Sequence, residues 1–285
     1  MKKVLVTGAT GFVGNYVIEE LLKNEVTVIA TSTSIEKASS FSWFPKVVFI
    51  PFNLNQYEET TNYLLYFNSP DLMIHLAWEG LPNYKSQFHV ETNLPRHTLF
   101  LENLIRNGLK DLTVTGTCFE YGMQEGCLSE EMTTYPDNPY AMAKDDLRKK
   151  IESLHKMYSF NFKWVRLFYM YGKGQNPKSI LSQLETALKN EESVFNMSGG
   201  EQIRDYLPIE KVAEYIVKIS IQHNINGIIN CCSGNPIKIK DFVSEYLLSV
   251  NKKINLNLGY YPYPDYEPMS FWGDNTKLKL ITDTK

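Results

Sequence analysis

Three glycines near the start of the chain constrain its fold more than any other feature. The apolar run at residues 4–6 meets Gly8, Gly11 and Gly14, and apolar residues at helical spacing follow from Asn15 to Asn24. This order predicts a strand, a tight turn and a helix. In that turn Gly8 allows the bend, Gly11 lets the backbone approach a pyrophosphate, and Gly14 lets the helix pack closely on the strand. Because N–H groups at a helix N-terminus attract anions, the stretch predicts a dinucleotide site, with a turn that binds nothing as the alternative.

Composition and charge limit the classes of protein that remain. The 285 residues are 43% hydrophobic, which is enough for one large core or two joined ones. The net charge of −3 comes without a basic run, so we expect no nucleic-acid partner. The first apolar run ends at Thr7, far short of a signal or membrane segment, so we expect a cytoplasmic protein without a membrane partner. No Cys-x-x-Cys pair is present, so we expect no metal and free thiols at Cys118, Cys127, Cys231 and Cys232.

Short apolar strands alternate with helical patterns along the chain. Further strands are predicted at 26–30, 47–50, 71–76, 112–115 and 228–231. Helical spacing is found within 57–67, 91–107, 174–192, 207–220 and 241–250. The alternation predicts an α/β fold with a doubly wound parallel sheet covered on both faces. The active sites of such sheets lie beyond the carboxyl ends of the strands.

The end of the second predicted strand bears on the choice of cofactor. An acidic residue there would accept hydrogen bonds from the ribose hydroxyls of NAD and repel a 2′-phosphate. The chain instead has hydroxyl residues at 31–34, including Ser32, with Lys37 downstream. Neutral hydroxyls and a cation tolerate a 2′-phosphate, so NADPH is favoured and NADH stays possible. A polar loop without preference is the alternative.

Three residues suggest proton transfer. Thr117 follows the predicted strand at 112–115, in the expected catalytic region. Tyr140 and Lys144 are four residues apart on a predicted helix, so the phenol and the ammonium share one face. A neighbouring cation stabilises a phenolate, so we expect Lys144 to lower the pKa of Tyr140. The pair predicts proton exchange with a substrate oxygen, although Tyr-x-x-x-Lys also occurs on solvated helix surfaces.

Together these motifs resemble the extended short-chain dehydrogenase/reductase family of nucleotide-sugar epimerases, dehydratases and ketoreductases. The resemblance covers nearly the whole chain. It rests on residues 7–14, 75–77, 117–122, 140–144, 166–172, 200–206 and 229–234. It implies a Rossmann domain of residues 1–167 and 205–232, with a smaller sugar-nucleotide-binding portion of residues 168–204 and 233–285.

The same resemblance implies roles for individual residues. Tyr140 is the implied acid/base, Lys144 the residue that lowers its pKa, and Thr117 the partner of the reacting oxygen. The implied cofactor-binding residues are Gly8, Thr10, Gly11, Phe12, Val13, Ser32, Asn53, Leu54, Leu76, Ala77, Asn93, Tyr140 and Lys144. The implied substrate-binding residues are Thr117, Cys118, Phe119, Tyr140, Tyr169 and Arg204. Arg204 suits the substrate phosphates because of its bidentate fork, and an ion pair with Asp205 or another acid is the alternative.

Three positions depart from the family pattern. Cys118 and Phe119 stand where the dehydratases carry an Asp-Glu pair, so dehydration is disfavoured. Asn53 replaces a common Asp, but its amide oxygen can still accept from an adenine amine. Tyr169 replaces a usual Asn.

These features favour an NADPH-dependent reductase acting on the C4 ketone of a nucleotide 4-keto-6-deoxyhexose. By overall likeness, the chain resembles the dTDP-4-dehydro-6-deoxyglucose reductases of surface-polysaccharide and O-antigen synthesis. An NAD-dependent nucleotide-sugar 4-epimerase is the alternative, and a non-catalytic dinucleotide-binding sensor is a third hypothesis. Relatives dimerise through helices near Glu91 and Asn138, so we expect a homodimer. The nucleotide base and the sugar configuration stay open.

Overall fold

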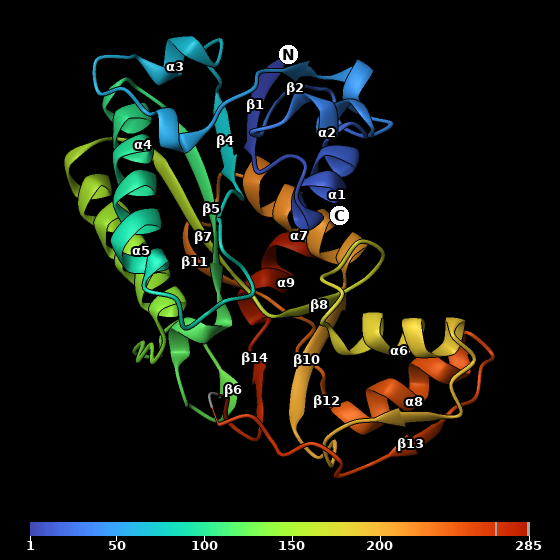
Figure 1. Cartoon of the computed structure of the whole chain (residues 1–285). Helices are drawn as coiled ribbons and strands as arrows, with labels where there is room; N and C mark the ends of the chain where they lie inside the picture. The colour runs from blue at the N-terminus through green and yellow to red at the C-terminus, as the bar shows by residue number, and fades with distance from the viewer. Residues whose placement is uncertain (266, 284–285) are drawn as a thin grey trace.

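A seven-stranded parallel sheet organises the larger part of the molecule, which is described by a computed structural model of residues 1–265 and 267–283 (Figure 1). Residues 266, 284 and 285 of the expected smaller portion lie outside the described residues. The strand order is β11-β7-β5-β4-β1-β2-β3. The bounds are β1 (Lys2–Thr7), β2 (Val26–Thr31), β3 (Val48–Phe49), β4 (Leu72–His75), β5 (Asp111–Thr117), β7 (Asn161–Leu167) and β11 (Gly227–Cys231). The predicted α/β fold with its doubly wound parallel sheet is confirmed.

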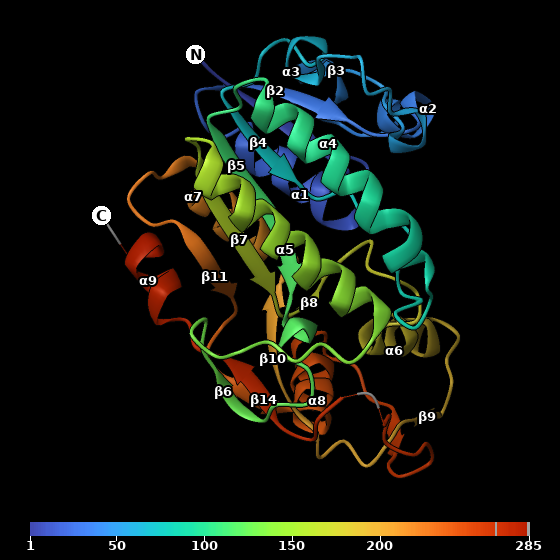
Figure 2. The same cartoon turned by 90° about the vertical axis from the view of Figure 1, so that its left-hand side faces the viewer.

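Helices cover both faces of this sheet. One face carries α1 (Phe12–Leu21), α7 (Ile209–Ile221) and α9 (Thr276–Thr282), and the other carries α4 (Leu94–Arg106) and α5 (Pro139–Met157). Figure 2 shows α4 and α5 side by side on the outside of their face. Val4 and Val6 point into the α1 and α7 core, whereas Leu5 points into the α4 and α5 core. A sheet buried on both faces explains why β1 is apolar without alternation.

The smaller portion lies at the end of the sheet where β5 finishes (Figure 1). Its three-stranded sheet consists of β8 (Tyr169–Tyr171), β10 (Ile203–Pro208) and β12 (Pro236–Lys238). Further pairs are β9 (Val194–Asn196) with β13 (Asn255–Asn257), and β6 (Gly126–Leu128) with β14 (Phe271–Gly273). The helices α6 (Ile180–Lys189) and α8 (Ile239–Ser249) close its core. Helix α9 instead packs on α7 and β11, so residues 276–282 lie with the large sheet, although the sequence grouped them with the smaller portion.

Two predicted helices differ from the structure. The expected helix at 57–67 is reduced to α3 (Tyr63–Tyr66), because the side chain of Asn62 accepts the N–H of Leu65 and starts a new helix there. The expected helix at 91–107 has α4 as its regular part, preceded by a π-helical turn at His89–Asn93. Gly108 follows α4 with a φ of +102°, as expected of a glycine at a helix C-terminus. The other short elements are α2 (Ile35–Ser39) and 3₁₀ turns at Phe44–Lys46, Leu54–Gln56 and Cys118–Tyr121.

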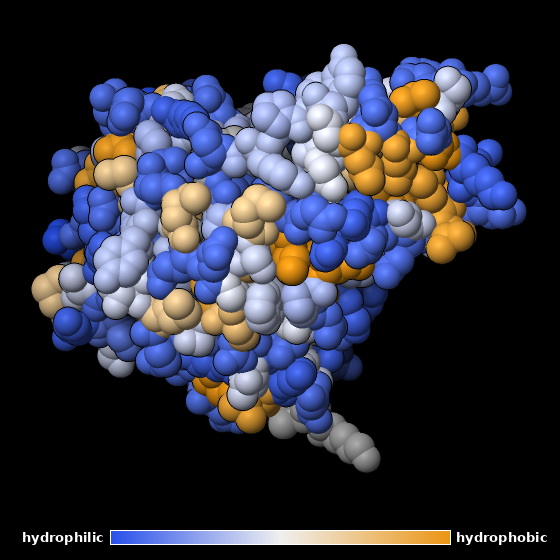
Figure 3. Space-filling model, turned by 90° about the horizontal axis from the view of Figure 1, so that it is seen from below, coloured by the Kyte–Doolittle hydropathy of each residue, from blue (hydrophilic) through white to orange (hydrophobic). Residues whose placement is uncertain are grey.

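Hydrophobic side chains gather at one end of the smaller portion. Figure 3, seen from below, shows this patch. Exposed apolar residues of this region include Val194 in β9, Leu248 in α8 and Leu258 beyond β13. Within the described chain, none of the helices combines the length and apolarity that crossing a bilayer requires. The four cysteines are free, and no cluster of three potential metal ligands occurs among the residues described.

Candidate functional site

The glycine turn forms a cradle at the start of α1. Gly8 has a φ of +69°, in the left-handed region that favours glycine. A Cβ on Gly14 would lie 2.2 Å from the carbonyl oxygen of Gly8, so any side chain there would push helix and turn apart. Gly11 is the N-cap of α1 and offers no side chain to the first N–H groups of the helix. Those donors have no partner within the helix, so the turn fits the pyrophosphate of a dinucleotide.

A cavity of about 680 Å³ opens from this turn toward the smaller portion. It brings together eleven of the residues expected at the site from sequence: Gly8, Gly11, Phe12, Val13, Leu76, Thr117, Cys118, Phe119, Tyr140, Lys144 and Tyr169. Its walls come from the ends of β4 and β5, the start of α5, and β8. The cavity lining, as far as the structure describes it, contains the cations Lys37 and Lys144 but no carboxylate.

The three expected catalytic residues share the inner wall of the cavity. Thr117 is the last residue of β5, and Tyr140 lies in the first turn of α5, which begins after the N-cap Asn138. The side-chain oxygen of Asn138 accepts the N–H of Ala141 at 3.0 Å and fixes the start of this helix. One turn on, the Lys144 ammonium donates to the carbonyl oxygen of Thr115 at 2.9 Å.

Burial dominates the protonation of Tyr140 and Lys144. Burial raises the pKa of Tyr140 above its ordinary value, and the nearby Tyr84 and Glu120 raise it further, whereas a hydrogen bond with Thr117 acts in the opposite direction. Burial also lowers the pKa of Lys144 to about 7, against the raising effect of Glu120. The pKa of Tyr140 is thus raised overall in this structure, chiefly by burial, and a lowering effect of Lys144 on it stays a prediction. Tyr140 is a protonated phenol at neutral pH.

Seven residues expected at the site do not line the cavity. These residues are Thr10, Ser32, Asn53, Leu54, Ala77, Asn93 and Arg204. Asn53 caps its own 3₁₀ turn by accepting the N–H of Asn55 at 2.9 Å. The amide of Asn93 is buried and donates to the carbonyl oxygen of Glu79 at 2.9 Å, which holds the loop after β4. Both side chains are thus held by groups of the protein itself.

Arg204 is buried in β10 behind the cavity wall. Its guanidinium donates to the Glu267 carboxylate at 2.8 Å and to the carbonyl oxygen of Ile203 at 2.8 Å. The guanidinium carbon of Arg204 lies 4.5 Å from the centre of the Phe271 ring. Arg204 is thus paired with an acid, as in the alternative interpretation, although that acid is Glu267 and not Asp205.

The turn after β2 carries both an acid and a cation. The Ser34 hydroxyl donates to Glu36 at 2.8 Å and accepts the N–H of Lys37 at 3.0 Å. Lys37 lines the cavity. Residues 31–34 contain no acid. The turn nevertheless carries a carboxylate, because Glu36 in the first turn of α2 contacts Ser34.

Aromatic residues missed in the sequence complete the site. Trp78 lies 4.1 Å below the Lys144 ammonium and stacks on His97, with ring centres 4.6 Å apart. Tyr84 lies 5.5 Å from the Tyr140 ring, and its carbonyl oxygen accepts the N–H of Tyr140 at 3.1 Å. Trp78 directly follows Leu76 and Ala77, which the sequence predicts to contact the cofactor. This position in the chain could have indicated that Trp78 belongs to the site. Tyr84 lies in a loop without regular periodicity, so no pattern indicated it.

Comparisons with known proteins agree with this geometry. The model of the NAD dependent epimerase/dehydratase family matches residues 4–232. The chain is 28% identical to dTDP-6-deoxy-L-talose 4-dehydrogenase (NAD(+)) of Aggregatibacter actinomycetemcomitans, over 95% of this chain and 98% of that protein. It is 21% identical to dTDP-4-dehydro-6-deoxyglucose reductase of Escherichia coli, over 88% of this chain and 82% of that protein.

A solved structure extends the likeness to the fold. The UDP-glucose-4-epimerase from Stenotrophomonas maltophila, with bound NAD, superposes with a TM-score of 0.87 at 16% identity. The match covers 100% of this chain and 93% of that chain. The glycine cradle, the strand order and the family match lead to one conclusion, and the resemblance found in the sequence is confirmed. The chain belongs to the NAD-dependent epimerase/dehydratase family.

Proposed function

We propose that this enzyme reduces the C4 ketone of a nucleoside-diphosphate 4-keto-6-deoxyhexose, with dTDP-4-dehydro-6-deoxyglucose as the first candidate, in surface-polysaccharide and O-antigen sugar synthesis. The observation that carries the proposal is the cavity, where Thr117, Tyr140 and Lys144 meet the glycine cradle without a carboxylate among the described lining residues. Elimination of water needs an acid and a base at the sugar, so a carboxylate-free lining supports oxidoreduction at a carbonyl. The names of the dehydrogenase and reductase relatives support a 6-deoxyhexose.

The residues of the chain can perform each step of a reduction. A bound dihydronicotinamide supplies the hydride. The Thr117 hydroxyl donates a hydrogen bond to the ketone oxygen, which stabilises the negative charge that develops there. Tyr140 then gives its proton to the new alkoxide, which is a stronger base than a phenolate. The raised pKa of Tyr140 supports this direction, because the phenol carries the needed proton at neutral pH.

We propose NADPH as the preferred hydride donor, with NADH as a second one. Lys37 lines the cavity and can attract a 2′-phosphate. Glu36 beside it favours free ribose hydroxyls, so the choice depends on the balance of these two charges. NAD in the solved relatives supports the nicotinamide class.

A homodimer in the cytoplasm is proposed as the working form. Leu99 on α4 and Met142 on α5 are each nearly half exposed. Two such helix faces could bury these residues against a second copy. Sedimentation at micromolar concentration tests this proposal, and a monomer would contradict it.

The deciding experiment mixes the purified protein with NADPH or NADH and a panel of nucleotide 4-keto-6-deoxy sugars, and follows the absorbance of reduced nicotinamide. Stoichiometric oxidation supports the reductase. Interconversion of C4 epimers without net consumption would favour a 4-epimerase, an alternative that the epimerase relatives support. Tyr140→Phe is the matched variant, which we expect to bind the cofactor without turnover. A non-catalytic sensor would show no turnover in either protein and keep its biological activity in the variant.

A further inference from the structure

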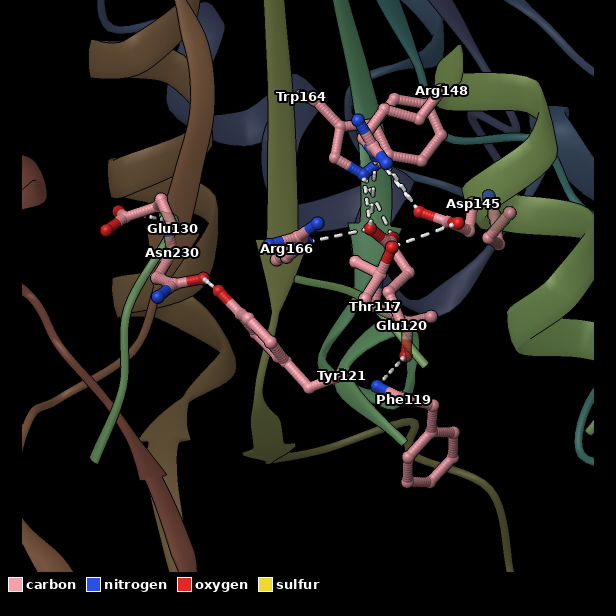
Figure 4. Close-up of polar contacts among 12 residues, drawn as sticks. Thr117, Phe119, Glu120, Tyr121, Glu130, Asp145, Arg148, Trp164, Arg166 and Asn230 are labelled. Atoms are coloured by element: carbon pink, nitrogen blue, oxygen red, sulfur yellow. Dashed lines mark hydrogen bonds and ion pairs between the residues drawn. The ribbon is translucent and has the colours of Figure 1, made fainter. Parts of the chain in front are cut away.

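Glu120 is a buried carboxylate beside the catalytic turn for which the proposed reaction has no use. It is fully buried one turn after Thr117 and does not line the cavity. Its Oε1 atom accepts the main-chain N–H of Thr117 at 2.8 Å, and Trp164 Nε1 donates to the same atom at 2.9 Å. Its Oε2 atom accepts from Arg166 Nε at 2.7 Å. Figure 4 shows these groups converging on the carboxylate.

The local chain is built to receive this carboxylate. The Thr117 hydroxyl accepts the N–H of Phe119 at 3.3 Å while Glu120 accepts the N–H of Thr117, which makes a reciprocal capping box. A Cβ on Gly116 would lie 2.3 Å from Glu120 Oε1 and 2.1 Å from Trp164 Nε1. The last residues of β5 therefore leave space that the Glu120 carboxylate fills.

The charges around Glu120 come from two neighbouring elements. Arg166 on β7 has Glu120 as its carboxylate partner, and its guanidinium also lies 4.4 Å from the Tyr121 ring. Arg148 on α5 approaches Glu120 to only 4.0 Å, because Asp145 and Glu152 hold it at 2.7 Å each. Asp145 also binds Lys149. Glu120 and Arg166 thus form the central pair of the network.

On the cavity side, Glu120 acts on both members of the catalytic pair. Its negative charge raises the pKa of Tyr140 and that of Lys144. The other titratable groups that face these two side chains are Tyr84, Cys118, His75, His89 and His97. Burial raises the pKa of the Cys118 thiol and lowers the pKa of each of the three histidines. The thiol and the three imidazoles are therefore neutral near pH 7.

We propose that Glu120 is a positioning residue, which holds the main chain of Thr117 and places a fixed negative charge behind Tyr140 and Lys144. The kinetic part of this inference rests on the proposed function, and the structural part does not. A negative charge disfavours the phenolate and favours the ammonium. Glu120 therefore adds to the burial that keeps Tyr140 protonated and opposes the burial that favours neutral Lys144.

Two variants separate the two roles. Glu120→Gln keeps an oxygen for the N–H of Thr117 but removes the charge. We expect the basic limb of its kcat against pH profile to move to lower pH by about half to one unit, since without the Glu120 charge the Lys144 ammonium loses its proton more readily. Glu120→Asp keeps the charge but withdraws the carboxylate by one methylene. Its basic limb should stay in place while kcat falls about tenfold or more, because Thr117 is no longer held.

A matched control lies on the same pair of strands. Asp111, at the opposite end of β5, is buried and pairs with Lys163 of β7 at 2.6 Å. Asp111→Asn therefore disturbs an equivalent pair without touching Thr117. We expect it to lower stability without moving the pH profile. A limb that shifts equally in Asp111→Asn and Glu120→Gln, or in neither, would refute the charge role.

Hydrogen exchange tests the positioning role without substrate. In Glu120→Asp, the mildest change, we expect the Thr117 amide to exchange at least about tenfold faster than in Asp111→Asn. Equal exchange in the two variants would refute the positioning role. A wild-type protein that turns over none of the sugars would contradict the proposed function, and the exchange result would then decide on Glu120 by itself.

Discussion

Replacing Lys144 with methionine should reveal how much stability the site costs. The Lys144 ammonium is buried, with Thr115 as its hydrogen-bond acceptor and the Trp78 ring beneath it. Burial lowers its pKa from 10.5 to about 7. Between pH 7 and pH 10.5, the unfolded chain therefore keeps a proton on Lys144 that the folded protein has already released. Because the unfolded state then binds more protons, the free energy of unfolding rises with pH in this window.

The magnitude follows from the size of the shift. One pKa unit corresponds to about 1.4 kcal/mol, so the buried ammonium costs about 4 kcal/mol at pH 7 and about 2 kcal/mol at pH 9. Methionine fills a similar volume without a charge, although it leaves the carbonyl of Thr115 without its donor. We expect Lys144→Met to be more stable than the wild type at pH 7, and this advantage to shrink by about 2 kcal/mol by pH 9.

Urea unfolding of both proteins at pH 7, 8 and 9 measures this difference, with tryptophan fluorescence as the signal and a reductant for the four thiols. Lys150→Met, at an exposed lysine of the same helix, controls for the loss of one charge. Parallel pH dependences for the wild type and Lys144→Met would refute the reasoning, because the linkage requires the lysine. Loss of turnover together with a gain in stability would indicate that the buried charge serves function.

Three further outcomes can be checked directly. Lys37→Ala should weaken NADPH binding about fivefold or more with little effect on NADH, and Glu36→Gln should shift preference the other way; cofactor fluorescence titrations measure both. Gly14→Ala should lower the free energy of unfolding by about 2–3 kcal/mol in urea, because the new Cβ meets the Gly8 carbonyl at 2.2 Å. The Tyr169 hydroxyl is buried without a hydrogen-bond partner among the described groups, so Tyr169→Phe should keep or gain up to about 1 kcal/mol of stability while raising the KM for the sugar nucleotide.

Features set by neighbours in the chain could be predicted from the sequence. The glycine turn, the Gly108 helix end and the spacing of Tyr140 and Lys144 each depend on residues a few positions apart. The order of strands and helices was predictable for the same reason. The helix expected at 57–67 was wrong because the hydrophobic spacing does not report the competing N-cap at Asn62.

Features set by residues far apart in the chain were not predictable in this way. Arg204 meets Glu267, 63 residues away, and the pairing of β5 with β7 brings Arg166 to Glu120, 46 residues away. The protonation of Tyr140 depends on how deeply it is buried, which sequence spacing does not report. Spacing along one helix places two side chains on one face but leaves their surroundings undefined.

The close approach of Gly116 to Glu120 has a consequence for how the family can change. Because a Cβ at position 116 would lie 2.1 Å from Trp164 Nε1 and 2.3 Å from Glu120 Oε1, the glycine cannot be exchanged freely while either side chain is retained. We expect glycine at the strand end wherever Glu120 or Trp164 is retained among relatives, and alanine or serine there only where both have been replaced by smaller side chains. Joint inheritance of these three residues would then separate one lineage of the family from another.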